Sequence, residues 1–297
     1  MKKAALLRVA LVLVVLMGLA VALLQWAVSG IDDWKGLALN LGTELVGAAV
    51  TYALFELVIE RIEKREEEKK EVEAKKAELI GQMCSQSRDV AIAAVEELRR
   101  RGWLSDGSLR GAKLDRVKLP EVYLSRADLQ GASLTWANLQ GASLSRANLQ
   151  GVSLFSANLQ EARLFKARLQ GAQLSADLRG VCLRLANLQG ANLGGTKLQG
   201  AQLPDANLEG AKLTRANLQG AQLFSANLRG ANLSRANLQG ASLTWANLQG
   251  ANLCYANLRE AKFDERTTLP DGTRWTPHTD MARFTDPKHP DFWRSDA

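Results

Sequence analysis

The sequence has few cysteines, few histidines and no pattern typical of a catalytic or metal site. Cys84, Cys182 and Cys254 are far apart and form no C-x-x-C pair, so we expect neither a disulfide framework nor a metal site, and a reducing compartment fits them. His278 and His289 are the only histidines, and no nearby nucleophile or third group completes a catalytic set. We therefore expect a protein that is not an enzyme and that has no cofactor.

Aromatic residues are also scarce, at 6% of the chain, although hydrophobic residues make up 46%. Leucine and alanine supply most of the apolar content. A globular core of this size usually contains larger and more varied side chains, whereas a stack of identical layers does not need them. The composition therefore favours a repetitive architecture.

A five-residue repeat occupies the middle of the chain. A leucine recurs at every fifth position from Leu109 to Leu174, and the repeat resumes from Leu178 to Phe263, giving 32 units. A small residue, usually alanine, stands two positions before nearly every centre. Self-similarity at a short fixed period predicts a solenoid. One residue is missing at 175–178, where we expect a local kink or tight turn rather than a domain boundary.

The unit A-[DN]-L-x-x, as in Ala137-Asn138-Leu139-Gln140-Gly141, resembles the repeat of the pentapeptide repeat family. The resemblance implies an all-β, right-handed quadrilateral β-helix over residues 102–263. It also implies that four units form one turn and that the central leucine and the preceding small residue point inward. Eight turns at roughly 4.8 Å per layer would extend about 38 Å. Glycine at every second corner predicts that two opposite corners need either a positive φ or a close approach of the backbone.

Residues two positions after each centre point outward and form columns with a 20-residue period. One column contains Arg126, Arg146 and Lys166, and after the slip it reaches Trp245; the other contains Trp136. The basic column is either a solvated face or a contact surface for an acidic partner, anionic lipid or nucleic acid. Exposed tryptophans often anchor partners. We take these five residues as the candidate interaction surface.

The charge of the repeat bears on one function known in this family. Some members resemble duplex DNA in shape and charge and bind topoisomerase, which needs a strongly acidic surface. Between Gly102 and Phe263 the sequence contains 18 Lys and Arg residues and nine Asp and Glu residues. DNA mimicry is therefore disfavoured. Direct nucleic-acid binding is not expected either, because no helix-in-groove motif or aromatic-rich sheet supports it.

The first 60 residues predict a membrane hairpin with helices at about 9–28 and 37–59. The first apolar run is long enough to cross a bilayer, although a cleaved signal peptide is the alternative. Glu44 in the second run would contact a partner helix or, on a sharper interpretation, form a proton or ion site. Basic residues flank both runs, which predicts a multi-pass membrane protein with both termini in the cytoplasm. The resemblance to the pentapeptide repeat family, most of whose members are bacterial, implies that this membrane is the bacterial inner membrane.

Two helical segments and a tail complete the expected organisation. Residues 61–101 predict a charged helical stalk followed by a cap helix at 88–101, because the open end of a solenoid needs a cover. Leu269-Pro270-Asp271-Gly272 reads as a turn. The aromatic residues that follow it predict that the tail, 264–297, covers the other end.

The leading functional hypothesis is a non-enzymatic, membrane-anchored scaffold. It would present a rigid β-helical rod to an unknown cytoplasmic protein, with the lipid bilayer as a second partner. One alternative is a signalling or transport-associated protein whose hairpin forms a homo-oligomer. Another is a rod that binds nucleic acid or topoisomerase.

Overall fold

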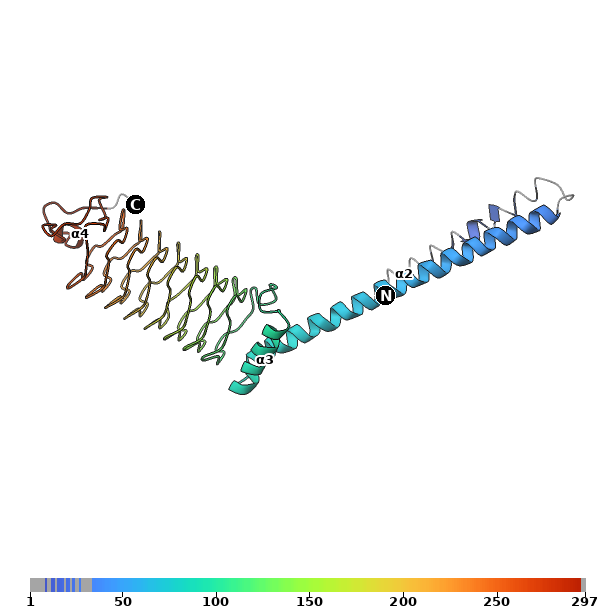
Figure 1. Cartoon of the computed structure of the whole chain (residues 1–297), viewed down its shortest axis with the longest axis horizontal. Helices are drawn as coiled ribbons and strands as arrows, with labels where there is room; N and C mark the ends of the chain where they lie inside the picture. Colours follow the sequence, from blue (N-terminus) through green and yellow to red (C-terminus); the bar gives the residue numbers. More distant parts are fainter. Residues whose placement is uncertain are drawn as a thin grey trace. The chain divides into compact units, whose positions relative to one another are not determined.

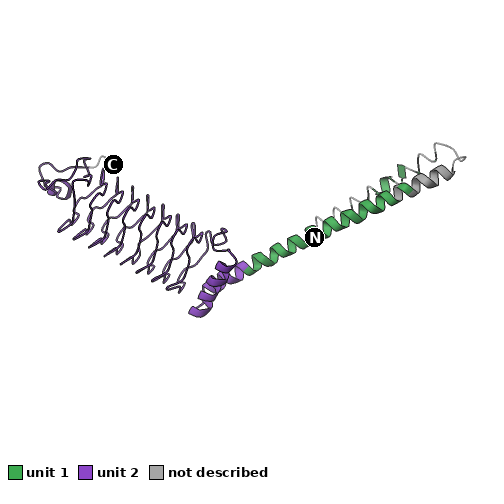
Figure 2. Cartoon of the chain, in the orientation of Figure 1, with its two compact units in different colours: residues 1–75 green, residues 76–297 purple. Residues whose placement is uncertain are grey.

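The computed structural model of the chain describes residues 34–294 and, before them, residues 9, 12–13, 15–18, 20–21, 23–24 and 27. The labelled helices are α2 (Trp34–Met83), α3 (Arg88–Arg100) and α4 (Ala282–Thr285). The chain divides into two compact units, Met1–Lys75 and Lys76–Ala297 (Figure 2). The stacked turns between α3 and α4 contain the five-residue repeat (Figure 1).

The prediction of a membrane hairpin needs correction. Among the described residues, no helix combines the length and the apolarity that crossing a membrane requires. The second predicted span, 37–59, lies inside the 50-residue helix α2, which carries Glu44 and Glu56 within that span and continues as charged sequence. This finding overturns the expected multi-pass location in the bacterial inner membrane with both termini in the cytoplasm.

Other parts of the hairpin prediction lie outside the described residues. Eight of the 20 residues of the first predicted span, 9–28, are among them, as are its basic flank and the connecting loop up to residue 33. The backbone of Glu44 belongs to α2, but its side chain is not described. The charged segment after residue 60 is helical up to Met83.

The repeat forms a coil in which each turn contains about 20 residues. Parallel bridges connect residues 20 apart over most of its length, for example Asn207 with Asn227. Four such bridge positions occur in each turn, so every layer has four sides. The central leucines and the alanines two positions earlier are almost all buried in one continuous core. Hydrogen bonds between consecutive layers pair the backbone N–H and carbonyl groups on the sides of the coil.

The missing residue at 175–178 shortens one corner without interrupting the stack. Four bridges there join residues 19 apart, such as Asn158 with Asp177. At ordinary corners the leucine carbonyl accepts a hydrogen bond from the alanine N–H three residues later, as from Ala157 to Leu154. At the short corner the buried Thr196 hydroxyl donates instead to the Leu174 carbonyl at 2.7 Å. Of the predicted kink or tight turn, the structure has the kink, as a bend at Ala176, and a side chain from the next layer stabilises it.

The corner conformation differs from the expectation based on glycine. A positive φ or a close approach of the backbone was predicted only where glycine recurs, at two opposite corners. Among the described residues, sixteen non-glycine residues also have a positive φ, including Arg146 at 60° and Trp136 at 61°. All four corners therefore use the same left-handed residue two positions after the centre. Its side chain points into solvent, which lets larger residues occupy a conformation that costs about 1–2 kcal/mol each.

Each end of the coil is covered by other residues of the second unit. On α3, Ala91, Ala94, Val95 and Leu98 are buried and continuous with the core. The helix closes with a Schellman motif, in which Gly102 N–H bonds to the Arg99 carbonyl and Trp103 N–H to the Leu98 carbonyl.

At the other end, residues 269–272 form the predicted turn, with the Gly272 N–H bonded to the Leu269 carbonyl. Phe284 of α4 is buried against this end of the core. Trp275 stacks on Phe263, the last repeat centre.

Candidate interaction surface

The four corners of each turn form two kinds of edge along the coil. Two opposite edges, which we call the glutamine edges, carry Gln followed by Gly in most layers. The other two vary. The first edge carries corner residues 115–116, 135–136, 155–156, 175, 194–195, 214–215, 234–235 and 254–255. The second edge carries 125–126, 145–146, 165–166, 184–185, 204–205, 224–225 and 244–245. The aromatic corner residues of the repeat therefore lie on the two variable edges, whereas charged corner residues occur on all four edges.

Exposed aromatic pairs lie on both variable edges. On the first edge, Trp136 is 58% exposed and meets Phe155 of the next layer edge to face, with ring centroids 6.3 Å apart. On the second edge, Trp245 is 46% exposed and lies 5.5 Å from the ring of Phe224. The guanidinium of Arg266 lies over the Trp245 ring at 4.0 Å. Each tryptophan is thus held by a neighbour while much of its surface stays open.

The predicted basic column is present on the second edge. The N–H of Arg126 donates to Ser145 and that of Arg146 to Phe165, which places Arg126, Arg146 and Lys166 one layer apart. All three side chains are exposed. Trp245 lies on this same edge and Trp136 on the opposite one, so the five predicted residues form two surfaces rather than one.

Several residues beside these were not predicted. Phe155 and Phe224 stand one position before the left-handed corner residue and therefore fell outside the columns considered in the sequence. Arg184 occupies the same position, and Arg163 and Arg168 lie on the adjoining sides. The 20-residue period could have found all five, because it applies to every position of the unit.

The recurring asparagines have a structural role. Their side-chain oxygens accept the N–H two residues later, as Asn138 does from Gln140. They also bond to one another between layers, as from Asn227 to Asn207 at 3.2 Å. These interactions fasten the turns, so the asparagine columns are part of the frame.

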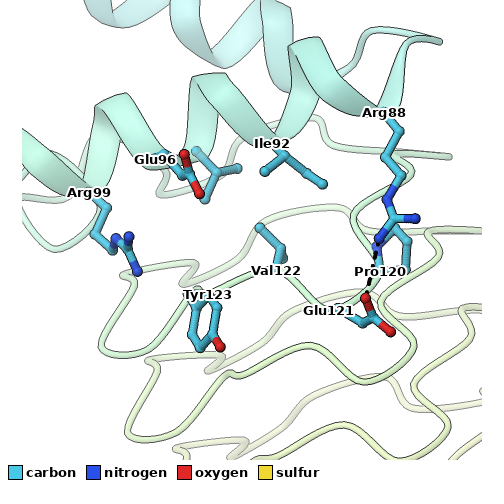
Figure 3. A pocket seen from close by; sticks show the side chains of 9 residues that line it. Arg88, Ile92, Glu96, Arg99, Pro120, Glu121, Val122 and Tyr123 are labelled. Atoms are coloured by element: carbon cyan, nitrogen blue, oxygen red, sulfur yellow. Dashed lines mark hydrogen bonds and ion pairs between the residues drawn. The ribbon is translucent and has the colours of Figure 1, made fainter.

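A shallow groove lies between α3 and the first turns of the coil (Figure 3). Its volume is about 170 Å³, and Ile92 of α3 and Val122 of the coil contribute apolar surface. On one side of the groove, Arg88 forms an ion pair with Glu121 at 3.3 Å. On the other side the Arg99 guanidinium lies 5.6 Å from the Tyr123 ring. These contacts hold the cap helix on the coil.

The two histidines lie in the tail beside a polar hollow of about 460 Å³. His289 Nε2 lies 3.0 Å from Asp280 Oδ2. The backbone N–H of Ala282 and then the His289 side chain hold the pKa of Asp280 below its usual value. This pair fastens the tail to itself. Within the described part of the chain, no group of three or more His, Cys, Asp or Glu side chains could hold a metal ion.

The sequence model of the family described as Pentapeptide repeats matches the chain in eight copies, at residues 108–146, 132–171, 142–200, 191–230 and 231–265. These ranges cover residues 108–265, more than half of the 297 residues. The chain belongs to the pentapeptide repeat family. The coil is accordingly a right-handed quadrilateral β-helix.

Solved pentapeptide repeat proteins are similar to this chain over the coil. HetL of the cyanobacterium Nostoc sp. strain PCC 7120 is 29% identical over 62% of this chain and 98% of its own, with a TM-score of 0.23. QnrB1, a plasmid-mediated fluoroquinolone resistance protein, is 22% identical over 52% and 89%, with a TM-score of 0.35. A thylakoid-lumen protein of Arabidopsis thaliana is 32% identical over 37% and 73%, with a TM-score of 0.28. These low scores lend this chain no function. No curated protein matches it.

Proposed function

We propose that this pentapeptide repeat protein is a non-enzymatic scaffold whose rigid coil binds partner proteins through its two variable edges. The exposed aromatic pairs support this proposal most directly. Trp136 and Trp245 lie on opposite edges and are separated by about five layers, roughly 25 Å along the coil at the usual layer spacing. They offer two independent anchor points.

Both tryptophans combine an exposed ring with a side chain that is already ordered. Large aromatic side chains dominate the energetics of many protein interfaces. Each tryptophan here already packs against a phenylalanine, with ring centroids 6.3 Å apart for Trp136 and 5.5 Å apart for Trp245. A side chain that is ordered before binding loses less conformational entropy when a partner covers it. The layered backbone, bonded turn by turn, holds both anchors at a fixed separation.

The test uses the full chain as immobilised bait in a lysate of its own organism. Trp136→Ala and Trp245→Ala should each reduce capture of a specific protein by at least about 30-fold, the loss expected for an interface anchor. Gln219→Ala and Gln239→Ala on a glutamine edge are the matched controls and should retain it. If all four variants capture the same proteins equally well, the proposal is wrong. Circular dichroism establishes that each variant is folded.

A further inference from the structure

Six cations gather around the second edge within a few layers of the coil. They are Arg126, Arg146, Arg163, Lys166, Arg168 and Arg184, which we call the basic cluster, and all six side chains are exposed. The Lys166 N–H donates to the Arg184 carbonyl at 3.0 Å, so these two residues occupy adjacent layers. Arg163 bridges to Ser143 and Arg168 to Asn148, on the two sides that meet at this edge.

The basic cluster is poorly neutralised by the chain itself. Among the described residues, Arg126, Arg146, Arg163, Lys166 and Arg168 form no ion pair. Arg168 donates a hydrogen bond to Gln150, and Lys166 lies over the ring of Phe165. Only Arg184 meets a carboxylate, that of Asp205 at 4.0 Å. Clustered like charges repel one another, so an external anion would relieve a cost that the folded chain carries alone.

The basic cluster is short and has defined ends. In the corner column, Lys166 is followed by Leu185 and then by Asp205. In the first layer of the cluster, beside Arg126, the buried carboxylate of Asp128 is paired with Arg110 at 2.6 Å. A long polyanion such as nucleic acid would extend past both carboxylates. A short acidic segment would not.

We propose that the basic cluster is a docking site for an acidic α-helix of a partner protein. Successive cations of the corner column are about 4.8 Å apart, the usual spacing of parallel layers. Carboxylates at i, i+4 and i+7 of a helix span about 10.5 Å along its axis, against about 9.6 Å for two layers of the coil. The mismatch over two steps is only about 0.9 Å, which long arginine, lysine and glutamate side chains absorb. This inference rests on the proposed scaffold function and specifies the chemistry of one partner.

The experiment measures binding of labelled peptides to the full chain by fluorescence anisotropy at two salt concentrations. The probe is an alanine-rich helical peptide of about 20 residues with glutamates along one face. A second peptide has the same composition with the glutamates spread around the helix. A single-stranded oligonucleotide of equal charge is the third ligand. The one-face peptide should bind at least about tenfold more tightly than either alternative, and more weakly at high salt.

Charge reversal locates the site. The triple variant Arg126→Glu, Arg146→Glu, Lys166→Glu should lose the binding. Glutamate is tolerated at this corner position, because Glu121, Glu161 and Glu260 occupy it with a positive φ. The matched control Arg215→Glu, at the same position of the opposite edge, should bind as the native chain does.

Equal binding of the two peptides, tighter binding of the oligonucleotide, or full binding by the triple variant would each overturn the proposal. None of these outcomes bears on the tryptophan anchors, because the test of the scaffold function uses different residues and a different readout. Unchanged capture by the tryptophan variants together with selective binding of the one-face peptide would overturn the tryptophan anchors and leave the basic cluster as a docking site.

Discussion

The shortened corner at 175–178 allows a quantitative prediction about how the coil tolerates a missing residue. Among the described residues, the Leu174 carbonyl accepts its hydrogen bond from the Thr196 hydroxyl at 2.7 Å and from no backbone N–H. Both residues are buried, with Thr196 0% exposed. Thr196→Val keeps the shape of the side chain and removes the donor. An unpaired buried carbonyl costs about 1–3 kcal/mol, and we expect a loss of unfolding free energy in this range.

A repaired corner supplies the control. Inserting a glycine between Ser175 and Ala176 restores the five-residue spacing, so the Ala176 N–H reaches the Leu174 carbonyl as at other corners. In that background Thr196→Val should cost less than about 0.5 kcal/mol, since the carbonyl keeps a donor. Urea denaturation gives the free energies and hydrogen exchange localises the change to the neighbouring layers. Equal losses of stability in both backgrounds would refute the role of the threonine hydroxyl.

Four further substitutions test the corners, the slip and the tail. Ser225→Gly should stabilise the coil by up to about 1 kcal/mol, because it relieves backbone strain at a positive φ. Gly220→Ala should destabilise the coil by about 1–2 kcal/mol through the same strain, since an added Cβ there meets nothing within 4 Å. A higher melting temperature for Gly220→Ala than for Ser225→Gly would contradict this. The Arg179 side chain holds the pKa of Asp177 below its usual value, so its contribution is present above pH about 4 and is lost as pH falls through the lowered pKa. The free energy of unfolding should therefore fall less steeply with decreasing pH in Asp177→Asn than in the native chain. Superimposable curves of stability against pH would refute this role of Asp177. Phe284→Ala should cost about 3–5 kcal/mol, seen as faster hydrogen exchange in the last turns, whereas unchanged exchange would show that the tail does not cover the coil.

The repeat made the inner architecture predictable. The period predicted a stack of similar layers, and the resemblance to the pentapeptide repeat family added four units per turn, from which the core and the outward columns followed. The position of the slip was also readable. The role of Thr196 was not, because a threonine in place of alanine looks conservative until its hydroxyl is seen beside an unpaired carbonyl.

The corners show where sequence reasoning stops. Glycine at 131 and 141 indicated a positive φ, but Trp136 and Arg146 adopt the same conformation because the stacked backbone imposes it on ordinary corners of all four edges. The contact between Trp136 and Phe155 was missed because only one position of each unit was followed.

The membrane prediction failed for a related reason. The length of the apolar runs was given more weight than the charges within them. Glu44 and Glu56 lie within the predicted second span of α2, and the described residues contain no helix suited to a membrane crossing.

The central claim is that the variable edges bind partners while the glutamine edges only build the coil. The most direct test is titration calorimetry of the full chain with a captured and purified partner. We expect the combined variant Trp136→Ala, Trp245→Ala to weaken the Kd by at least about 30-fold, with Gln219→Ala, Gln239→Ala unchanged. If the glutamine variant weakens binding as much as the tryptophan variant, the claim is wrong.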